Sequence, residues 1–114
     1  MVVRNATRNL ILADNCSYAG TFLSRFRGLQ FKKNLPEGHG LLITPCRSIH
    51  MFFMRFPIDA VFIDTNNKIV YIAEGIKPWR ISKHVRSAKS VLELPAGTVS
   101  VTGTRAGDQL ELCE

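Results

Sequence analysis

The chain has 114 residues, 46% of them hydrophobic and 21% charged, and its 15 Lys and Arg against 9 Asp and Glu give a net charge of +6. This composition excludes collagen-like, low-complexity and highly charged disordered proteins. No apolar run approaches the ~20 residues that span a bilayer, so no membrane partner is expected. We expect one domain over residues 1–114, located in the cytoplasm because the N-terminal sequence lacks a signal-peptide pattern.

The first predicted elements are a short strand and a short helix. The apolar run at residues 9–13 is typical of a buried strand. Thr21 is suited to cap a helix that follows, which ends near Gly28. Its apolar residues recur at helical spacing and are expected to pack inward: Phe22, Leu23, Phe26 and Leu29. We therefore expect one short N-terminal helix.

The rest of the chain has the rhythm of a mainly β protein. Strands are predicted at residues 41–44, 48–54, 58–63, 68–74, 90–94 and 108–112, with turn-forming residues between them. The run Pro95-Ala96-Gly97 opens a turn or a second, single helical turn. Short strands with one or two short helices indicate a small β-sandwich or barrel of jelly-roll-like build.

Several short motifs recur in a recognisable order. They are RFRGL at 25–29, GHGLL at 38–42, IHMFFM at 49–54, PIDAVFID at 57–64, AK at 88–89, VLELPAG at 91–97 and AGD at 106–108. In order and spacing they resemble the uncharacterised family known as domain of unknown function 192. One departure is that many relatives read Trp-Met-Lys-Asn-Thr where this chain has FMRFP at 53–57. The resemblance implies a compact, mainly β fold and supplies no activity or catalytic residue.

The motif around His50 carries soft side chains at alternate positions. On a strand, residues two apart share a face, which would align Cys46, Ser48, His50, Phe52 and Met54. Thiolate, imidazole and thioether suit copper(I) or zinc, but the run is too long for one ion. The alternative is that the sulfur side chains fill the core while His50 is hydrogen-bonded at a pocket edge. Because the three cysteines have no C-x-x-C spacing, we expect no metal, disulfide or cofactor.

Three carboxylates lie in or beside predicted strands: Asp59, Asp64 and Glu93. A buried carboxylate needs a partner, and Arg25 or Arg55 is the candidate for Asp59. Under that pairing, an Arg25→Ala change would lower the melting temperature by several degrees. The chain contains no G-x-S-x-G or H-E-x-x-H motif, so the sequence favours a protein that is not an enzyme.

The segment 77–89 is the candidate binding segment. It holds five of the fifteen basic residues, no acidic residue and the only tryptophan. Trp79 beside Arg80 offers a ring face next to a charge, suited to a base, a sugar ring or a carboxylated ligand. The alternative is that Trp79 closes one end of the fold while Lys77 and Lys83 are simply solvated.

These features favour a non-enzymatic binding module for an anionic or ring-containing ligand or another acidic partner. The expected site is Trp79, Arg80, Lys77 and Lys83, with the His50 strand as its floor and Arg25, Asp59 and Met54 as a polar or structural set. One alternative is a nucleic-acid-binding protein that uses the basic segment. Another is an enzyme of unknown reaction that uses Asp59 or His50. The oligomeric state is left open.

Overall fold

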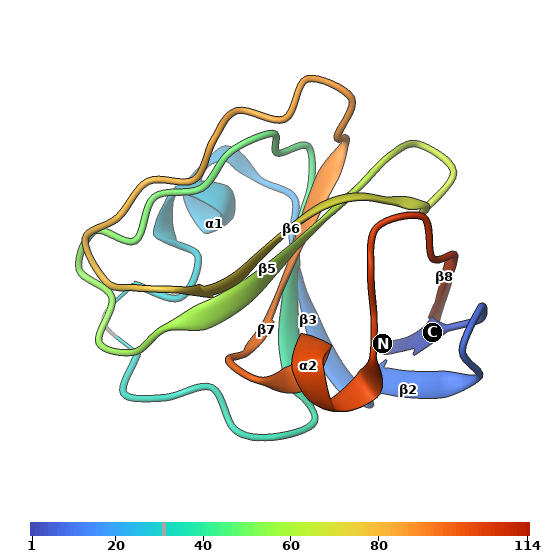
Figure 1. The fold of residues 1–114 in the computed structure, drawn as a ribbon. Coiled ribbons are helices and arrows are strands. Elements are labelled where there is room, and N and C mark those ends of the chain that lie inside the picture. The colour runs from blue at the N-terminus through green and yellow to red at the C-terminus, as the bar shows by residue number, and fades with distance from the viewer. Residues whose placement is uncertain (31) are drawn as a thin grey trace.

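The computed structural model describes residues 1–30 and 32–114; for Phe22, Leu23 and Phe26 it describes the backbone alone. The elements in chain order are β1 (Val2–Asn5), β2 (Leu10–Ala13), β3 (Asn15–Ala19), α1 (Phe22–Arg27), β4 (His39–Ile43), β5 (Ile58–Ile63), β6 (Ile69–Ile76), β7 (Ser90–Pro95), α2 (Thr98–Thr102) and β8 (Leu110–Cys113). They form two sheets, ordered β2-β1-β8 and β3-β4-β7-β5-β6 (Figure 1). The described helices are too short to cross a membrane.

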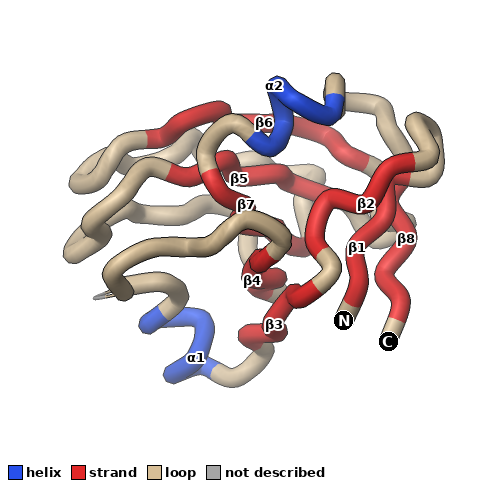
Figure 2. Tube along the Cα trace, turned by 90° about the horizontal axis from the view of Figure 1, so that it is seen from below, coloured by secondary structure: helices blue, strands red, loops and turns tan. Residues whose placement is uncertain are grey.

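Strand β5 is buried along its whole length because both faces of the five-stranded sheet are covered. Ala60 and Phe62 belong to one apolar core, and Val61 and Ile63 belong to the other. The first core is covered by Leu29, which follows α1, and by residues from the long loops before β5 and before β7. The second core is covered by α2 and by the three-stranded sheet, on the opposite side from α1 (Figure 2). A polar residue on β5 or β7 therefore enters one core or the other according to its position in the strand.

The mainly β prediction is confirmed, but several details differ. The helix is not N-terminal, because three strands precede it, and two of these, β1 and β3, were not predicted from the sequence. Residues 48–54 do not form a strand; only His50 makes a bridge there, to Ile81. Phe53, three residues after His50, has a φ of 62°, and a left-handed residue interrupts an extended strand. The jelly-roll or barrel assignment stays a prediction.

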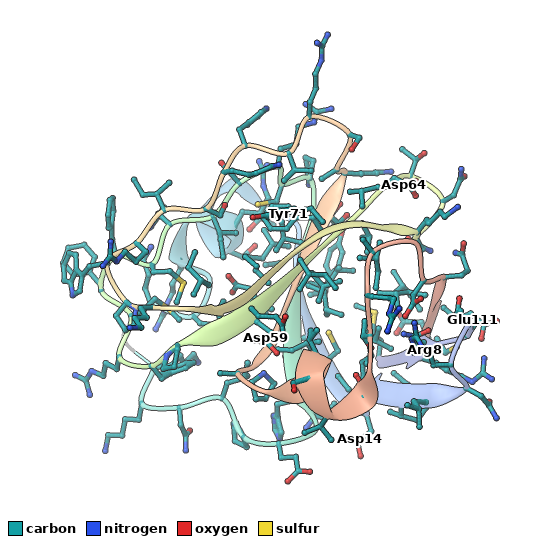
Figure 3. The ribbon with its side chains drawn as sticks, viewed as in Figure 1. Arg8, Asp14, Asp59, Asp64, Tyr71 and Glu111 are labelled. Carbon is teal, nitrogen blue, oxygen red and sulfur yellow. The ribbon has the colours of Figure 1, made fainter. Side chains whose placement is uncertain are left out.

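The expected partnership of Asp59 with an arginine is wrong. The Asp59 carboxylate instead accepts hydrogen bonds from three backbone N–H groups: Gly75 at 2.8 Å, Gly97 at 3.1 Å and Val99 at 2.9 Å. Figure 3 shows Asp59 between β5 and α2. Arg25 Nη1 donates to the Pro45 carbonyl at 3.0 Å. The stability effect predicted for Arg25→Ala through an unpaired Asp59 therefore has no structural basis.

Asp108 is a buried acid that links the N-terminal strand region to the C-terminal one. It accepts hydrogen bonds from Asn5 Nδ2 at 3.0 Å, Arg8 Nε at 2.7 Å and the Arg105 backbone N–H at 3.1 Å. Burial alone raises the pKa of Asp108, but these hydrogen bonds and the charge of Arg8 outweigh it and hold the pKa below the ordinary 3.8. The stabilisation is therefore present above that ordinary value and is lost as the pH falls through the lowered one.

We expect the urea midpoint of the wild-type protein to fall between pH 5 and pH 3, and to fall less steeply in an Asp108→Asn variant. The variant loses the ionised acceptor, so it starts from a lower stability at pH 7. Urea unfolding at pH 7, pH 5 and pH 3 measures both effects. Equal acid dependence in the two proteins would contradict this role of Asp108.

Candidate functional site

Two long irregular segments, 46–54 and 77–89, run side by side. Their backbones are joined at several points: Cys46 N to Lys89 O at 2.8 Å, Val85 N to Arg47 O at 2.8 Å, Ser82 N to Ile49 O at 2.9 Å, Met51 N to Arg80 O at 2.7 Å and Trp79 N to Met51 O at 2.8 Å. The ladder is antiparallel and too irregular to form continuous strands. It brings the His50 motif and the basic segment, which are distant in sequence, to the same place.

Phe53 and Trp79 form an exposed pair of rings at one end of this ladder. Their side chains are 49% and 59% exposed, and the rings meet edge to face at 5.0 Å between centroids. Both residues have left-handed backbones, with φ of 62° and 68°. Bulky residues rarely adopt such values, and the strain clusters at functional sites. We call the rings of Phe52, Phe53 and Trp79 the aromatic platform.

His50 reaches the aromatic platform through Phe52. The His50 and Phe52 rings lie 4.9 Å apart, and the Phe52 and Trp79 rings lie 5.9 Å apart. The predicted floor and the predicted tryptophan are therefore neighbours across one intervening ring. Arg80 follows Trp79 in the chain and is exposed.

The basic residues of the segment 77–89 do not all face the platform. Lys77 and Arg80 flank Trp79 in sequence and are exposed. The Lys83 ammonium lies instead over the Tyr71 ring of β6, 4.5 Å from its centroid. Of the proposed cations, Lys77 and Arg80 are thus the ones that neighbour Trp79 in the chain.

A second feature is a small polar cavity of about 60 Å³ beneath the same segment. It lies where the end of α1, β4, β7 and the segment 46–54 converge. Its lining residues are Arg25, Arg27, Gly28, Leu29, Gln30, Ile43, Cys46, Ser48, Ile49, His50, Met54 and Glu93. Four of the five residues that the predicted strand would have aligned therefore share a cavity, although their backbone is irregular.

Glu93 is the least expected member of this cavity. It alternates with Leu92 and Leu94 on β7, so its side chain enters the first core while theirs enter the second. The residue is 4% exposed, and burial raises the pKa of its carboxyl to about 8. Among the described residues, Glu93 Oε1 and Arg25 Nε are buried without a hydrogen-bond partner. The sequence signal for this residue was an acidic side chain inside the apolar run 91–95. Glu93 was nevertheless not included in the expected site.

Cys46 is held as a thiol in this cavity. Its Sγ donates to the Ser48 carbonyl at 3.0 Å. Burial is the main effect that raises the pKa of the Cys46 thiol, and nearby Glu93 adds to it. A thiol with a raised pKa is a poor nucleophile and a poor metal ligand. In the described part of the chain, no three His, Cys, Asp or Glu side chains gather as a metal site.

A larger cleft of about 570 Å³ lies between β2 and α2. Its rim carries the exposed side chains of Ile11 and Val101, and its charged lining residues are Asp14 and Glu37. The buried Asp59 that underlies α2 has its hydrogen bonds filled by backbone donors. Within the described residues, this cleft therefore lacks the unpaired buried polar atoms that distinguish the smaller cavity.

The comparisons with known proteins identify the family. The family described as Uncharacterized ACR, domain of unknown function 192, matches residues 2–112, and the chain belongs to it. A UPF0127 protein of Pyrococcus furiosus is 32% identical over 94% of this chain and 94% of its own length. A UPF0127 protein of Pyrococcus horikoshii is 32% identical over 96% and 97%.

Two solved structures share the fold. A protein of unknown function from Novosphingobium aromaticivorans has a TM-score of 0.82 at 20% identity, over 97% of this chain and 82% of that one. A protein from Sinorhizobium meliloti, described as a proposed transcription regulator, has a TM-score of 0.82 at 28% identity, over 96% and 89%. These likenesses establish the fold and leave the activity to be argued from the site.

Proposed function

We propose that this protein is a non-enzymatic binding module whose aromatic platform holds a ligand that carries both a flat ring and a negative charge. The observation that carries the proposal is the pair Phe53 and Trp79. Two bulky residues keep left-handed backbones and present large, exposed rings at the same place. An apolar side chain that served only the core would gain nothing from this arrangement, since exposure forgoes the free energy of burial.

The neighbouring charges suit the same ligand. A ring stacked on Trp79 gains about 1–3 kcal/mol, and the cationic Lys77 and Arg80 lie beside it in the chain. The basic segment 77–89 contains no acidic residue to compete for them. A nucleotide-like or aromatic carboxylate ligand matches both the ring and the charge.

The enzyme alternative loses one of its two residues. Both oxygens of Asp59 accept backbone hydrogen bonds. The carboxylate therefore has a structural role and is not available as a catalytic acid or base. Asp59 lies beside α2, in the second core, whereas His50 belongs to the cavity under the first. The two residues do not converge on one reacting atom, as general acid–base catalysis requires.

Trp79 is the only tryptophan of the chain, so its fluorescence reports on the platform directly. We expect saturable quenching by adenosine monophosphate, and affinity about tenfold weaker in Phe53→Leu and in Arg80→Gln, or ~1.4 kcal/mol each. Arg105→Gln is the matched control, because it removes one exposed arginine from the loop between α2 and β8.

The same titration with short single-stranded DNA and RNA separates the nucleic-acid alternative. An oligonucleotide response that weakens steeply with salt, with no response to the mononucleotide, would favour that alternative, because each neutralised phosphate releases a counterion. Absence of any fluorescence change, or Phe53→Leu binding with wild-type affinity, would overturn the proposed role of the platform.

A further inference from the structure

We propose that the cavity between α1, β4 and β7 is a second binding site, and that it takes a small carboxylate held between the Arg25 guanidinium and the Glu93 carboxyl. This site is separate from the aromatic platform and does not depend on it. The proposal rests on the geometry of the cavity and on the two polar atoms left unpaired in it.

The hydrogen bonding of the cavity favours a bound ligand. Buried polar groups in folded proteins almost always have a partner, and an exception calls for an explanation. Here, among the described residues, two exceptions line one cavity: Glu93 Oε1 and Arg25 Nε. Other atoms of Arg25 are engaged, since Nη1 donates to the Pro45 carbonyl. A ligand that bridges the two unpaired atoms would give each of them a hydrogen-bond partner.

The size of the cavity suits a small carboxylate. The cavity of about 60 Å³ corresponds to about two water molecules at ~30 Å³ each. Formate and acetate are ligands of this order of size, whereas a sugar or a nucleotide is far too large. Gly28 also lines this space, and a Cβ at that position would be in ordinary van der Waals contact with Glu93 Oε1, at 3.9 Å. The apolar part of the lining, Leu29, Ile43 and Ile49, suits a methyl group better than a second charge.

The charge of the cavity favours an anion. The charged and titratable groups around the cavity are Arg25 and Arg27 from α1, Cys46 and His50 from the segment 46–54, and Glu93 from β7. The Cys46 thiol is neutral, because burial raises its pKa. Burial also keeps the Glu93 carboxyl protonated up to about pH 8, so it donates a hydrogen bond rather than repelling an anion. The two arginines then give the cavity a net positive charge at neutral pH.

The ionisation of Glu93 makes the binding of a carboxylate pH-dependent. If the anion binds the protonated acid alone, the apparent dissociation constant rises about tenfold for each pH unit above about 8. Acetate itself does not titrate in that range, so the change reports on the protein. Ionised Glu93 would repel the ligand and turn towards Arg25 as the competing partner.

The test is calorimetric titration of the intact chain with acetate and with formate at pH 6.5 and pH 9.5, supported by NMR shifts of labelled acetate. We expect saturable binding at pH 6.5 that is at least tenfold weaker at pH 9.5. Arg25→Gln should abolish it. Glu93→Gln should bind at both pH values with nearly equal affinity, because the amide donates a hydrogen bond at any pH.

The control is Arg105→Gln, which lowers the net charge by the same amount outside the cavity and should bind acetate as the wild type does. If Arg25→Gln fails to fold, Arg25→Lys is the second variant, since it keeps the charge and removes the planar N–H donor. Absence of binding at pH 6.5 shows a cavity occupied by water only and overturns the proposal. A pH dependence that persists in Glu93→Gln would overturn it as well.

Discussion

Replacement of Glu93 by glutamine is expected to stabilise the protein strongly at alkaline pH. The carboxyl is buried, with a folded-state pKa of about 8 against an ordinary value of 4.5. In the unfolded chain it ionises near the ordinary value. The difference of about 3.5 pKa units, at ~1.36 kcal/mol each, sets an upper limit of about 5 kcal/mol.

The sign of the pH dependence follows from proton binding. Between about pH 4.5 and pH 8 the folded state holds a proton at Glu93 that the unfolded state has released. Stability therefore falls as the pH rises through this range and is constant above it, as far as this group is concerned. Glu93→Gln lacks the group and should show none of that fall.

Urea unfolding of both proteins at pH 5 and pH 9 measures this effect, and the variant should gain several kcal/mol relative to wild type between the two. Burial raises the pKa of the Cys16 and Cys46 thiols above 9.0, so they titrate little in this range. Glu74→Gln is the control, because Glu74 is exposed on β6. A parallel pH dependence in Glu93→Gln and wild type would show that the acid is not buried and protonated.

Replacement of Asp59 by alanine is expected to destabilise the protein by about 3–4 kcal/mol. The carboxylate is 1% exposed and accepts three backbone N–H groups from β6, from Gly97 and from the first turn of α2. Each buried donor left without a partner costs ~1–3 kcal/mol. In a chain of this length the melting temperature should fall by roughly 10–15 °C.

The matched control is Asp64→Ala. Asp64 also accepts two backbone N–H groups, from Asn66 and Lys68, but in an exposed turn where water can replace it. We expect a loss of about 1 kcal/mol or less there, measured by the same thermal unfolding. Equal losses in the two alanine variants would contradict the role of Asp59 as the acceptor that joins α2 to the sheet.

The glycines around Asp59 explain why its partners are backbone groups. Gly75 and Gly97 have φ values of 58° and 97°, and a Cβ at either position would meet open space. The backbone conformation, rather than crowding, therefore favours glycine at both positions. In these conformations the two N–H groups turn towards the carboxylate. These backbone partners could not be predicted by looking for a charged side chain to pair with Asp59.

The candidate site was predictable in part. The exposed tryptophan in a basic segment is visible in the sequence, because composition and loop position are local properties. The pairing of Trp79 with Phe53 is not visible, since it depends on a ladder between two irregular segments and on two left-handed residues. The polar cavity was missed because its defining atoms, on Arg25 and Glu93, come from residues far apart in the chain.

The sequence by itself determined the family, the mainly β character and the existence of a short capped helix, because hydrophobic periodicity, turn residues and capping act within a few residues of one another. Strands β1 and β3 escaped prediction, since they are short strands defined by their neighbours, β1 between β2 and β8 and β3 parallel to β4. Only the tertiary structure decided which core each face of β5 and β7 enters. That choice places Asp59 under α2 and Glu93 under α1, because the sheet is covered on both faces and a strand turns alternate residues to opposite sides.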